Sequence, residues 1–180
     1  MKTSAKQRGL SLIEVTVAMA VAVVLVGTAA PSLLDFIGTR RLEAAATQLA
    51  SDIQFVRSDA VARNQPLRLS FFNSADGSCY VIHTGAAASC SCAASGPATC
   101  TGSALQLKTV QLAARERVSV QANSASVLFD PLHGTASPTV TLRVLGANGR
   151  AVHHIVNVMG RVRSCSPLSA MAAMPGYAAC

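Results

Sequence analysis

The pattern of apolar and polar positions divides the chain into three stretches. The first is a long apolar run from Leu10 to Pro31. As a helix rising about 1.5 Å per residue, this run spans ~33 Å, close to the hydrocarbon core of a bilayer. One carboxylate, Glu14, lies near its start. A charge at this depth is costly unless it is neutralised or paired, so the pattern predicts a functional role for Glu14.

The second stretch, residues 35–63, is amphipathic and continues the same helix. Its apolar residues recur every three or four positions, which predicts that one helix face packs on a globular domain. Pro66 disfavours helix at the residue before it, so we expect one helix over residues 10–63. Residues 10–34 would then lie in a membrane. The predicted packing positions are Leu42, Ala45, Leu49, Ile53, Val56 and Ala60.

The third stretch, residues 64–180, alternates with a period of two, which is typical of β-strands. Residues 146–149 read Gly-Ala-Asn-Gly and predict a hairpin turn. No helical pattern interrupts the strands, so we expect an α+β fold in which the long helix packs against an antiparallel β-sheet domain. The predicted strands cover residues 67–72, 79–83, 105–112, 117–121, 126–129, 139–145, 152–158 and 161–164.

The distribution of charge predicts how the apolar helix is oriented in a membrane. The chain carries 15 Lys and Arg against 8 Asp and Glu, for a net charge of +7. Three of the basic residues precede the apolar run, at Lys2, Lys6 and Arg8, and a basic flank of this kind stays in the cytoplasm. Lys108 is the single lysine after this leader. The arginine bias suits bidentate recognition of carboxylate or phosphate, or reflects codon usage alone.

Four arginines near the C-terminus form the candidate binding site. Arg161 and Arg163 are two residues apart, so on a strand their side chains point the same way. Arg143 and Arg150 flank the predicted turn at 146–149. We expect both pairs to share one end of the domain and to form an anion-binding edge, because guanidinium groups match the phosphates of DNA.

Few acids accompany these arginines, and no Asp or Glu follows Asp130. The alternative to anion binding is a structural role, in which the arginines pair with Asp130, with Glu116 or with acids of neighbouring subunits. No aromatic residues interleave the arginines, so base stacking is not predicted. Binding through a few phosphate contacts is expected to be weak and sensitive to salt.

Six cysteines follow the apolar run, and their even number in a loop-rich region predicts disulfides formed in an oxidising compartment. Cys165 and Cys180 enclose a tail at 165–180 and are expected to pair. Cys90 and Cys92 point apart on an extended chain, so a bond between them would be strained. Two arrangements remain for the stapled loop at 85–102: Cys79–Cys90 with Cys92–Cys100, which we favour, or Cys79–Cys92 with Cys90–Cys100.

The sequence carries no catalytic signature. It contains no phosphate-binding loop, nucleophile elbow or HExxH motif, and its acids are scattered. The adjacent His153 and His154 point to opposite sides of a strand, and the cysteines lack the paired CxxC spacing of zinc sites. We therefore expect no enzymatic activity, no cofactor and no metal.

The basic leader, the hexapeptide Gly-Leu-Ser-Leu-Ile-Glu at 9–14 and the apolar run resemble the class III signal of type IV pilins and pseudopilins. The resemblance implies that a prepilin peptidase removes residues 1–9 by cleaving between Gly9 and Leu10, and then N-methylates Leu10. It implies that Glu14 meets the N-terminal amine of an adjacent subunit during assembly. The competing interpretation is an ordinary secretory signal cleaved near Ala30.

Three elements in the body of the chain narrow the resemblance to the GspH/FimT group. They are the helix-to-strand junction at 55–67, the segment 129–134 (similar to the group's Phe-x-Pro-x-Gly element), and residues 160–167. The last segment resembles the C-terminal element of FimT-like minor pilins, whose arginines bind double-stranded DNA during natural transformation.

This resemblance implies a minor type IV pilin with a type IV pilin-like fold. It would span the bacterial inner membrane once, with its N-terminus in the cytoplasm and its β-domain in the periplasm, before entering a pilus near the tip. Its implied partners are other pilins, the prepilin peptidase/methyltransferase and double-stranded DNA. The alternatives are a GspH-like pseudopilin of a type II secretion system and a FimU-like priming subunit that does not bind DNA.

Overall fold

The computed structural model describes residues 11–93 and 96–180. The chain divides into two compact units, Met1–Ile37 and Gly38–Cys180. Helix α1, Leu12–Arg63, begins in the first unit and ends in the second. Among the described residues, it is the one helix long and apolar enough to cross a membrane. This helix bears out the predicted element, apart from its first two residues, which lie outside the described part or before the helix start.

The part of α1 in the second unit buries one face completely. The fully buried positions are the predicted ones except at one turn, where Ala46 is buried and Ala45 is half-buried. The helix ends at Arg63 because Asn64 takes a left-handed conformation with φ 49°. The Gln65 N–H then donates to Ala60 O at 3.1 Å and the Asn64 N–H to Val61 O at 3.2 Å, the two bonds of a Schellman cap.

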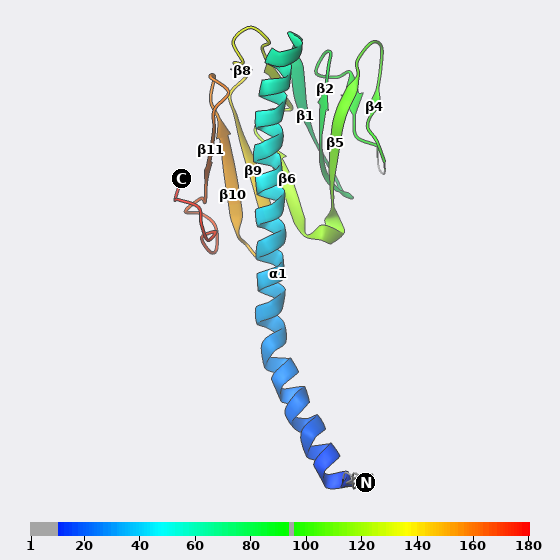
Figure 1. Ribbon diagram of the computed structural model, residues 1–180, viewed down its shortest axis with the longest axis vertical. Helices are drawn as coiled ribbons and strands as arrows, with labels where there is room; N and C mark the ends of the chain where they lie inside the picture. The colour runs from blue at the N-terminus through cyan, green and yellow to red at the C-terminus, as the bar shows by residue number, and fades with distance from the viewer. Residues whose placement is uncertain (1–10, 94–95) are drawn as a thin grey trace, which may run out of the picture. The chain divides into compact units, whose positions relative to one another are not determined.

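The second unit contains two antiparallel sheets and a short hairpin (Figure 1). The five-stranded sheet has the order β5-β2-β1-β7-β8, and the four-stranded sheet has the order β11-β10-β9-β6. All eight predicted strands are present, and β3, β4 and β8, of two residues each, were not predicted. The strands are β1 Leu67–Ser74, β2 Gly77–His83, β3 Cys90–Ser91, β4 Thr99–Cys100, β5 Gln106–Ala113, β6 Val118–Ala122, β7 Ser126–Phe129, β8 Ala136–Ser137, β9 Val140–Gly146, β10 Ala151–Val156 and β11 Val162–Cys165.

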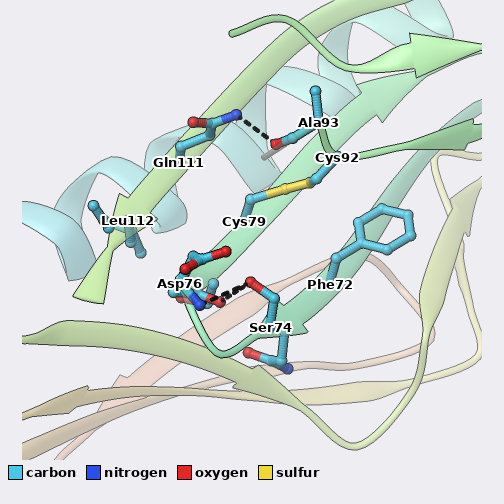
Figure 2. A pocket seen from close by; sticks show the side chains of 12 residues that line it. Phe72, Ser74, Asp76, Cys79, Cys92, Ala93, Gln111 and Leu112 are labelled. Carbon is cyan, nitrogen blue, oxygen red and sulfur yellow. Dashed lines mark hydrogen bonds between the residues drawn. A yellow bond between two sulfur atoms is a disulfide. The ribbon is translucent and has the colours of Figure 1, made fainter. Parts of the chain in front are cut away.

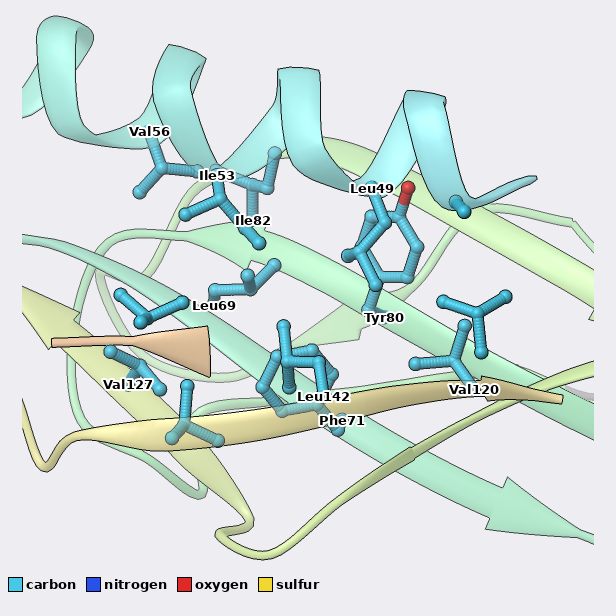
Figure 3. Close-up of a cluster of buried hydrophobic side chains, with 14 of the residues drawn as sticks. Leu49, Ile53, Val56, Leu69, Phe71, Tyr80, Ile82, Val120, Val127 and Leu142 are labelled. Carbon is cyan, nitrogen blue, oxygen red and sulfur yellow. The ribbon is translucent and has the colours of Figure 1, made fainter. Parts of the chain in front are cut away.

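The core lies between α1 and the inner faces of both sheets. Figure 3 shows Leu49 and Ile53 of α1 above Leu69 and Tyr80 of the five-stranded sheet and Leu142 of the four-stranded sheet. These side chains are almost fully buried. Apolar area removed from water is worth about 25 cal/mol per Å², so this shared core holds residues 38–63 of the helix and the two sheets together.

One polar cluster crosses the edge of this core. Asp52 of α1 is 5% exposed, accepts a hydrogen bond of 2.8 Å from the Tyr80 hydroxyl, and forms an ion pair of 2.6 Å with Lys108 of β5. Burial and the neighbouring carboxylate raise the pKa of Tyr80 far above its usual value, so its hydroxyl stays a donor. The cluster fixes the helix against β2 and β5.

The loop between β2 and β5 folds back over the outer side of the five-stranded sheet. Cys79, Val81 and Cys90 are buried there in a small apolar cluster of their own. The disulfides are Cys79–Cys92, which ties the loop to β2, and Cys90–Cys100, which joins the paired strands β3 and β4.

The favoured pairing of Cys79 with Cys90 and of Cys92 with Cys100 is therefore wrong. The observed pairing is determined by the β3–β4 hairpin, which places Cys90 directly opposite Cys100 with Cα atoms 4.1 Å apart. The sequence analysis did not predict this hairpin, because each of its strands is two residues long.

A candidate nucleic-acid interface

The outer face of the four-stranded sheet brings together two of the predicted arginines. Arg143 on β9 pairs with Gln121 on β6 and with His153 on β10, and His153 pairs in turn with Cys165 on β11. Directly paired residues point to the same side of a sheet, so these four side chains form one row across the outer face. The residues on either side of Arg143, at Leu142 and Val144, are buried in the core.

Arg163 lies in the next row of the same face, where it pairs with Ile155. Both Arg143 and Arg163 are exposed. One strand separates β9 from β11, so the Cα atoms of the two arginines lie roughly 12 Å apart. None of the four strands of this sheet contains an Asp or a Glu. The face therefore presents positive charge that no carboxylate of its own sheet neutralises.

A shallow groove of about 570 Å³ runs along this face. Arg143, Arg150 and His153 line it from the sheet, and Pro167 and Ser169 line it from the C-terminal tail. Partial burial, reinforced by the charge of Arg143, lowers the pKa of His153. The imidazole is therefore neutral at pH 7, and it adds charge to the groove on acidification.

The C-terminal tail forms the wall of this groove and is tied to the sheet. The Cys165–Cys180 disulfide closes the tail on the end of β11, which agrees with the predicted pair. The Arg150 guanidinium donates from Nη1 to Ala173 O at 2.6 Å, and the Met171 N–H donates to Gly149 O at 3.1 Å. Arg150 therefore both lines the groove and holds the tail.

Arg161 occupies a different position from the other three arginines. It ends the turn at 157–161 between β10 and β11, whereas Arg150 follows the turn between β9 and β10. These two turns lie at opposite ends of β10, so its length of about 20 Å separates them. The expectation that both arginine pairs share one end of the domain is wrong. Antiparallel pairing of three successive strands places their two connections at opposite ends.

A second hollow, of about 360 Å³, lies beside the Cys79–Cys92 disulfide (Figure 2). Asp76 provides its single carboxylate, and Gln111 donates to Ala93 O at 3.1 Å across its rim. One carboxylate without a partnering acid, base or nucleophile does not form a catalytic arrangement. In the described part of the chain, no three His, Cys, Asp or Glu side chains gather closely enough to hold a metal ion.

The N-terminal site residues lie at or beyond the start of the described chain. Gly9 and Leu10, predicted to flank the cleaved bond, lie outside the described residues. Glu14 lies in the first turn of α1 with an exposed side chain. Its backbone N–H donates to Ser11 Oγ at 3.3 Å, which makes Ser11 the N-cap of the helix.

The structure adds site residues that the sequence analysis did not assign. The sequence analysis considered His153 only as a metal ligand and rejected that role, yet the residue lies directly between Arg143 and the end of β11. Counting outward from a four-residue turn at 146–149 would have placed Val152 opposite Arg143, whereas the observed register pairs Gly146 with Arg150 and therefore places His153 there. Gln121 comes from β6, whose position beside β9 is a long-range pairing without a local sequence signal.

Comparison with known proteins agrees with this fold. The family model described as type II transport protein GspH matches residues 45–160, and the prokaryotic N-terminal methylation motif matches residues 4–30. No curated protein matches the chain.

Two crystal structures of the type IV minor pilin FimU from Pseudomonas aeruginosa strain PAO1 share the fold. The structure in space group P21 has a TM-score of 0.55 and 17% sequence identity, covering 74% of this chain and 98% of that chain. The structure in space group P65 has a TM-score of 0.51 and 17% identity, covering 71% and 98%. With the GspH model matching well over half of its length, and with this fold, the chain belongs to the GspH/FimT family of type IV minor pilins and pseudopilins.

Proposed function

We propose that the chain is a minor type IV pilin that is processed, held in the inner membrane and then built into a pilus. The match to the methylation motif supports cleavage after Gly9 and methylation of Leu10 by the prepilin peptidase. Residues 10–34 would anchor the chain and then enter the filament core among other pilins. Residues 35–63 would carry the periplasmic β-domain, residues 64–180. In this proposal, Glu14 pairs with the N-terminal amine of an adjacent subunit.

The proposed processing is tested by mass spectrometry of the mature protein. The expected N-terminus is Leu10 with one added methyl group, and a chain that begins near residue 30 would overturn the proposal.

The proposed pairing of Glu14 is tested by substitution. Glu14→Ala is expected to abolish incorporation into sheared pili while leaving cleavage intact. Glu14→Asp serves as the matched control, because it keeps the charge.

We further propose that the β-domain binds double-stranded DNA during natural transformation. The observation that carries this proposal is the outer face of the four-stranded sheet, where Arg143 lines a groove, Arg163 lies exposed in the next row, and no acid occurs on any strand of the sheet. Arginine contacts the phosphate backbone without regard to sequence. Incoming DNA of any sequence would therefore be a ligand, which suits uptake near the tip of a pilus.

The expected binding is weak and dominated by electrostatics. Each neutralised phosphate contributes about 0.9 to the slope of log affinity against log salt. With two to four arginines in contact, a dissociation constant in the micromolar to ~100 µM range is expected at moderate salt. The face carries no aromatic residue on which an unstacked base could lie, so duplex DNA is expected to bind at least as well as single strands.

The test titrates the full chain, in non-ionic detergent micelles with disulfides formed, into labelled duplex DNA. Arg161→Gln/Arg163→Gln is expected to weaken binding about tenfold or more, because each lost phosphate contact removes a charge-assisted hydrogen bond. The matched control is Arg41→Gln/Arg115→Gln, which removes the same charge from exposed positions on α1 and beside β5. Equal losses of affinity in both variants would indicate that binding depends on net charge alone, and would overturn the proposal that DNA binds to this face.

A second candidate function is purely structural. The GspH description of the matching family model favours a pseudopilin of a type II secretion system, and the FimU fold favours a pilus-priming subunit. In either case the arginines would pair with acids of neighbouring subunits. Absence of DNA binding by the folded wild-type chain, together with loss of assembly in Arg161→Gln/Arg163→Gln, would favour this candidate.

A further inference from the structure

Two turns lie side by side at the end of the second unit where α1 terminates. One turn, residues 130–135, joins β7 to β8, and the other, residues 157–161, joins β10 to β11. The Ala136 N–H donates to Val158 O at 2.9 Å and links them directly. The second turn ends at Arg161, so its conformation determines where the Arg161 side chain begins.

The 157–161 turn is closed by its own first residue. The Asn157 N–H donates to Arg161 O at 3.1 Å, and the Arg161 N–H donates to Asn157 Oδ1 at 2.9 Å. The Gly160 N–H donates to Asn157 O at 2.9 Å. These bonds set the shape of the turn, and the pairing of β10 with β11 holds it in the sheet, but none of these bonds links it to α1.

A side chain from the helix supplies that link. Arg57 of α1 is half-buried, and its Nε donates to Gly134 O at 3.0 Å. The same side chain lies against Gly160, where an added Cβ would come within 2.9 Å of Arg57 Cδ and 2.6 Å of Gly134 O. Gly134 and Gly160 have φ angles of +61° and +69°, so both positions favour glycine through their backbone as well.

Among the described residues, the Arg57 guanidinium has no acidic partner that explains its placement. In the described part of the chain, no carboxylate lies within ion-pair distance of it. Its charge is instead directed at a backbone carbonyl, and a hydrogen bond with a charged donor is stronger than a neutral one. Both turns therefore contact one side chain of the helix.

We infer that Arg57 is a positioning residue for DNA binding: it locks the 130–135 and 157–161 turns onto α1 and thereby fixes Arg161 relative to the sheet face that carries Arg163. This inference rests on the proposed DNA-binding function. Holding Arg161 in place before DNA arrives reduces the ordering cost that binding would otherwise include.

The test compares duplex affinity for the full chain in detergent micelles across matched variants. Arg57→Met is expected to weaken binding about three- to tenfold, the cost of ordering one long side chain and its turn. Arg57→Lys keeps the charge and one donor toward Gly134 O, and is expected to stay within about twofold of wild type. Arg63→Met removes one charge from the same end of α1, where Arg63 pairs with Asp59, and is expected to change affinity less than Arg57→Met.

A double-mutant cycle separates positioning from charge. If Arg57 acts through Arg161, Arg57→Met causes no further loss in an Arg161→Gln background. Gly160→Ala is a second route to the same answer. It changes no charge, yet it forces a methyl group against Arg57 and Gly134 O. Its loss of affinity is also expected to disappear in the Arg161→Gln background. Fully additive losses for both variants would overturn the inference.

Hydrogen exchange of the free protein keeps the two proposals distinguishable. Faster exchange of the Gly160 and Arg161 amides in Arg57→Met, with wild-type protection in Arg57→Lys, is expected whether or not DNA binds. Unchanged exchange in a folded Arg57→Met would overturn the positioning role. If Arg57→Met does not fold, Gly160→Ala supplies the same comparison. A wild-type chain that does not bind duplex DNA would overturn the proposed function and, with it, the role of Arg57 in binding.

Discussion

At the scale of single residues, the buried carboxylate of Asp52 shows how charge is accommodated in this domain. Tyr80 and Lys108 each satisfy one of its oxygens, at 2.8 Å and 2.6 Å. A buried acceptor that loses its partner costs more free energy than the hydrogen bond itself is worth. The cluster therefore stabilises the packing of α1 chiefly because Tyr80 and Lys108 satisfy the hydrogen-bonding capacity of the buried Asp52 carboxylate.

Tyr80→Phe is expected to lower the free energy of unfolding by about 1.5–3 kcal/mol, because Asp52 loses a donor in a buried position. Chemical denaturation followed by circular dichroism measures this change. Tyr177→Phe is the matched control, since Tyr177 is only half-buried and lies against the edge of the core. It is expected to change stability by less than about 0.5 kcal/mol, and equal losses in both variants would contradict the role given to the cluster.

His153 reports on the charge of the proposed DNA-binding face. Burial and the nearby Arg143 both lower its pKa below the ordinary value. Arg143→Gln removes the second cause, so the pKa of His153 is expected to rise in this variant and to remain below that of an exposed histidine. Nuclear magnetic resonance titration of the ring measures it directly. An unchanged pKa in Arg143→Gln would mean that the two side chains do not share one electrostatic environment.

At the scale of elements, the tail is a separate covalently closed piece of the binding face. The Cys165–Cys180 disulfide spans 15 residues. Closing a loop of that length lowers the conformational entropy of the unfolded chain, which raises the free energy of unfolding by about 3 kcal/mol. Cys165→Ala/Cys180→Ala is expected to lower stability by about that amount or less. It is also expected to increase amide exchange across residues 166–180 and to weaken DNA binding, because Arg150 holds this tail.

The matched control for the tail is Cys90→Ala/Cys100→Ala, which opens a disulfide of similar span, 10 residues, in the loop over the other sheet. It is expected to raise exchange in that loop and to leave DNA affinity unchanged. The comparison is made by hydrogen exchange and by duplex titration. If opening the tail left affinity unchanged too, the tail would not be part of the binding face.

The helix and most of the strands could be predicted from the sequence. The end of α1 at Arg63 follows from Pro66 and Asn64, and alternation revealed every strand longer than three residues. The cysteine pairing could not be predicted in the same way, because it depends on the hairpin of β3 and β4, whose two-residue strands alternation does not reveal. The place of Gln121 beside Arg143 could not be predicted either, because it depends on the long-range pairing of β6 with β9. The separation of Arg150 from Arg161, in contrast, already follows from three successive antiparallel strands, which place their two connections at opposite ends.

At the scale of the whole molecule, buried histidines link stability to pH. His83 and His154 are fully buried, and burial is the main cause that lowers the pKa of each. The folded state therefore takes up protons less readily than the unfolded chain, whose histidines titrate near pH 6.5. The stability they contribute is complete above pH ~6.5 and is lost as the pH falls toward the lowered pKa values.

Thermal unfolding of the full chain is expected to give a midpoint that is constant above pH 7 and declines as the pH falls below about 6.5. His83→Gln/His154→Gln is expected to flatten this decline, whatever it does to the midpoint at pH 7. A separate decline is expected below about pH 4, because backbone and side-chain hydrogen bonds from His133 lower the pKa of Asp130. A midpoint that rises on acidification from pH 7 to 5 would contradict this account.

The whole molecule combines a family-typical anchor with an arginine face that the proposed function assigns to DNA. The family and the pilin-like fold are established by the match over residues 45–160 and by the likeness to FimU. The choice between DNA and neighbouring subunits as the partner of the face depends on whether Arg143 and Arg163 contact phosphates together.

The most direct test of this central claim is the salt dependence of duplex DNA binding by the wild-type chain and by Arg143→Gln/Arg163→Gln. The account predicts that the variant binds more weakly and that its slope of log affinity against log salt is shallower by about 1.8, for two lost phosphate contacts. The Arg41→Gln/Arg115→Gln control is predicted to keep the wild-type slope. Equal slopes for the wild type and the Arg143/Arg163 variant would contradict the account and show that this face does not bind DNA.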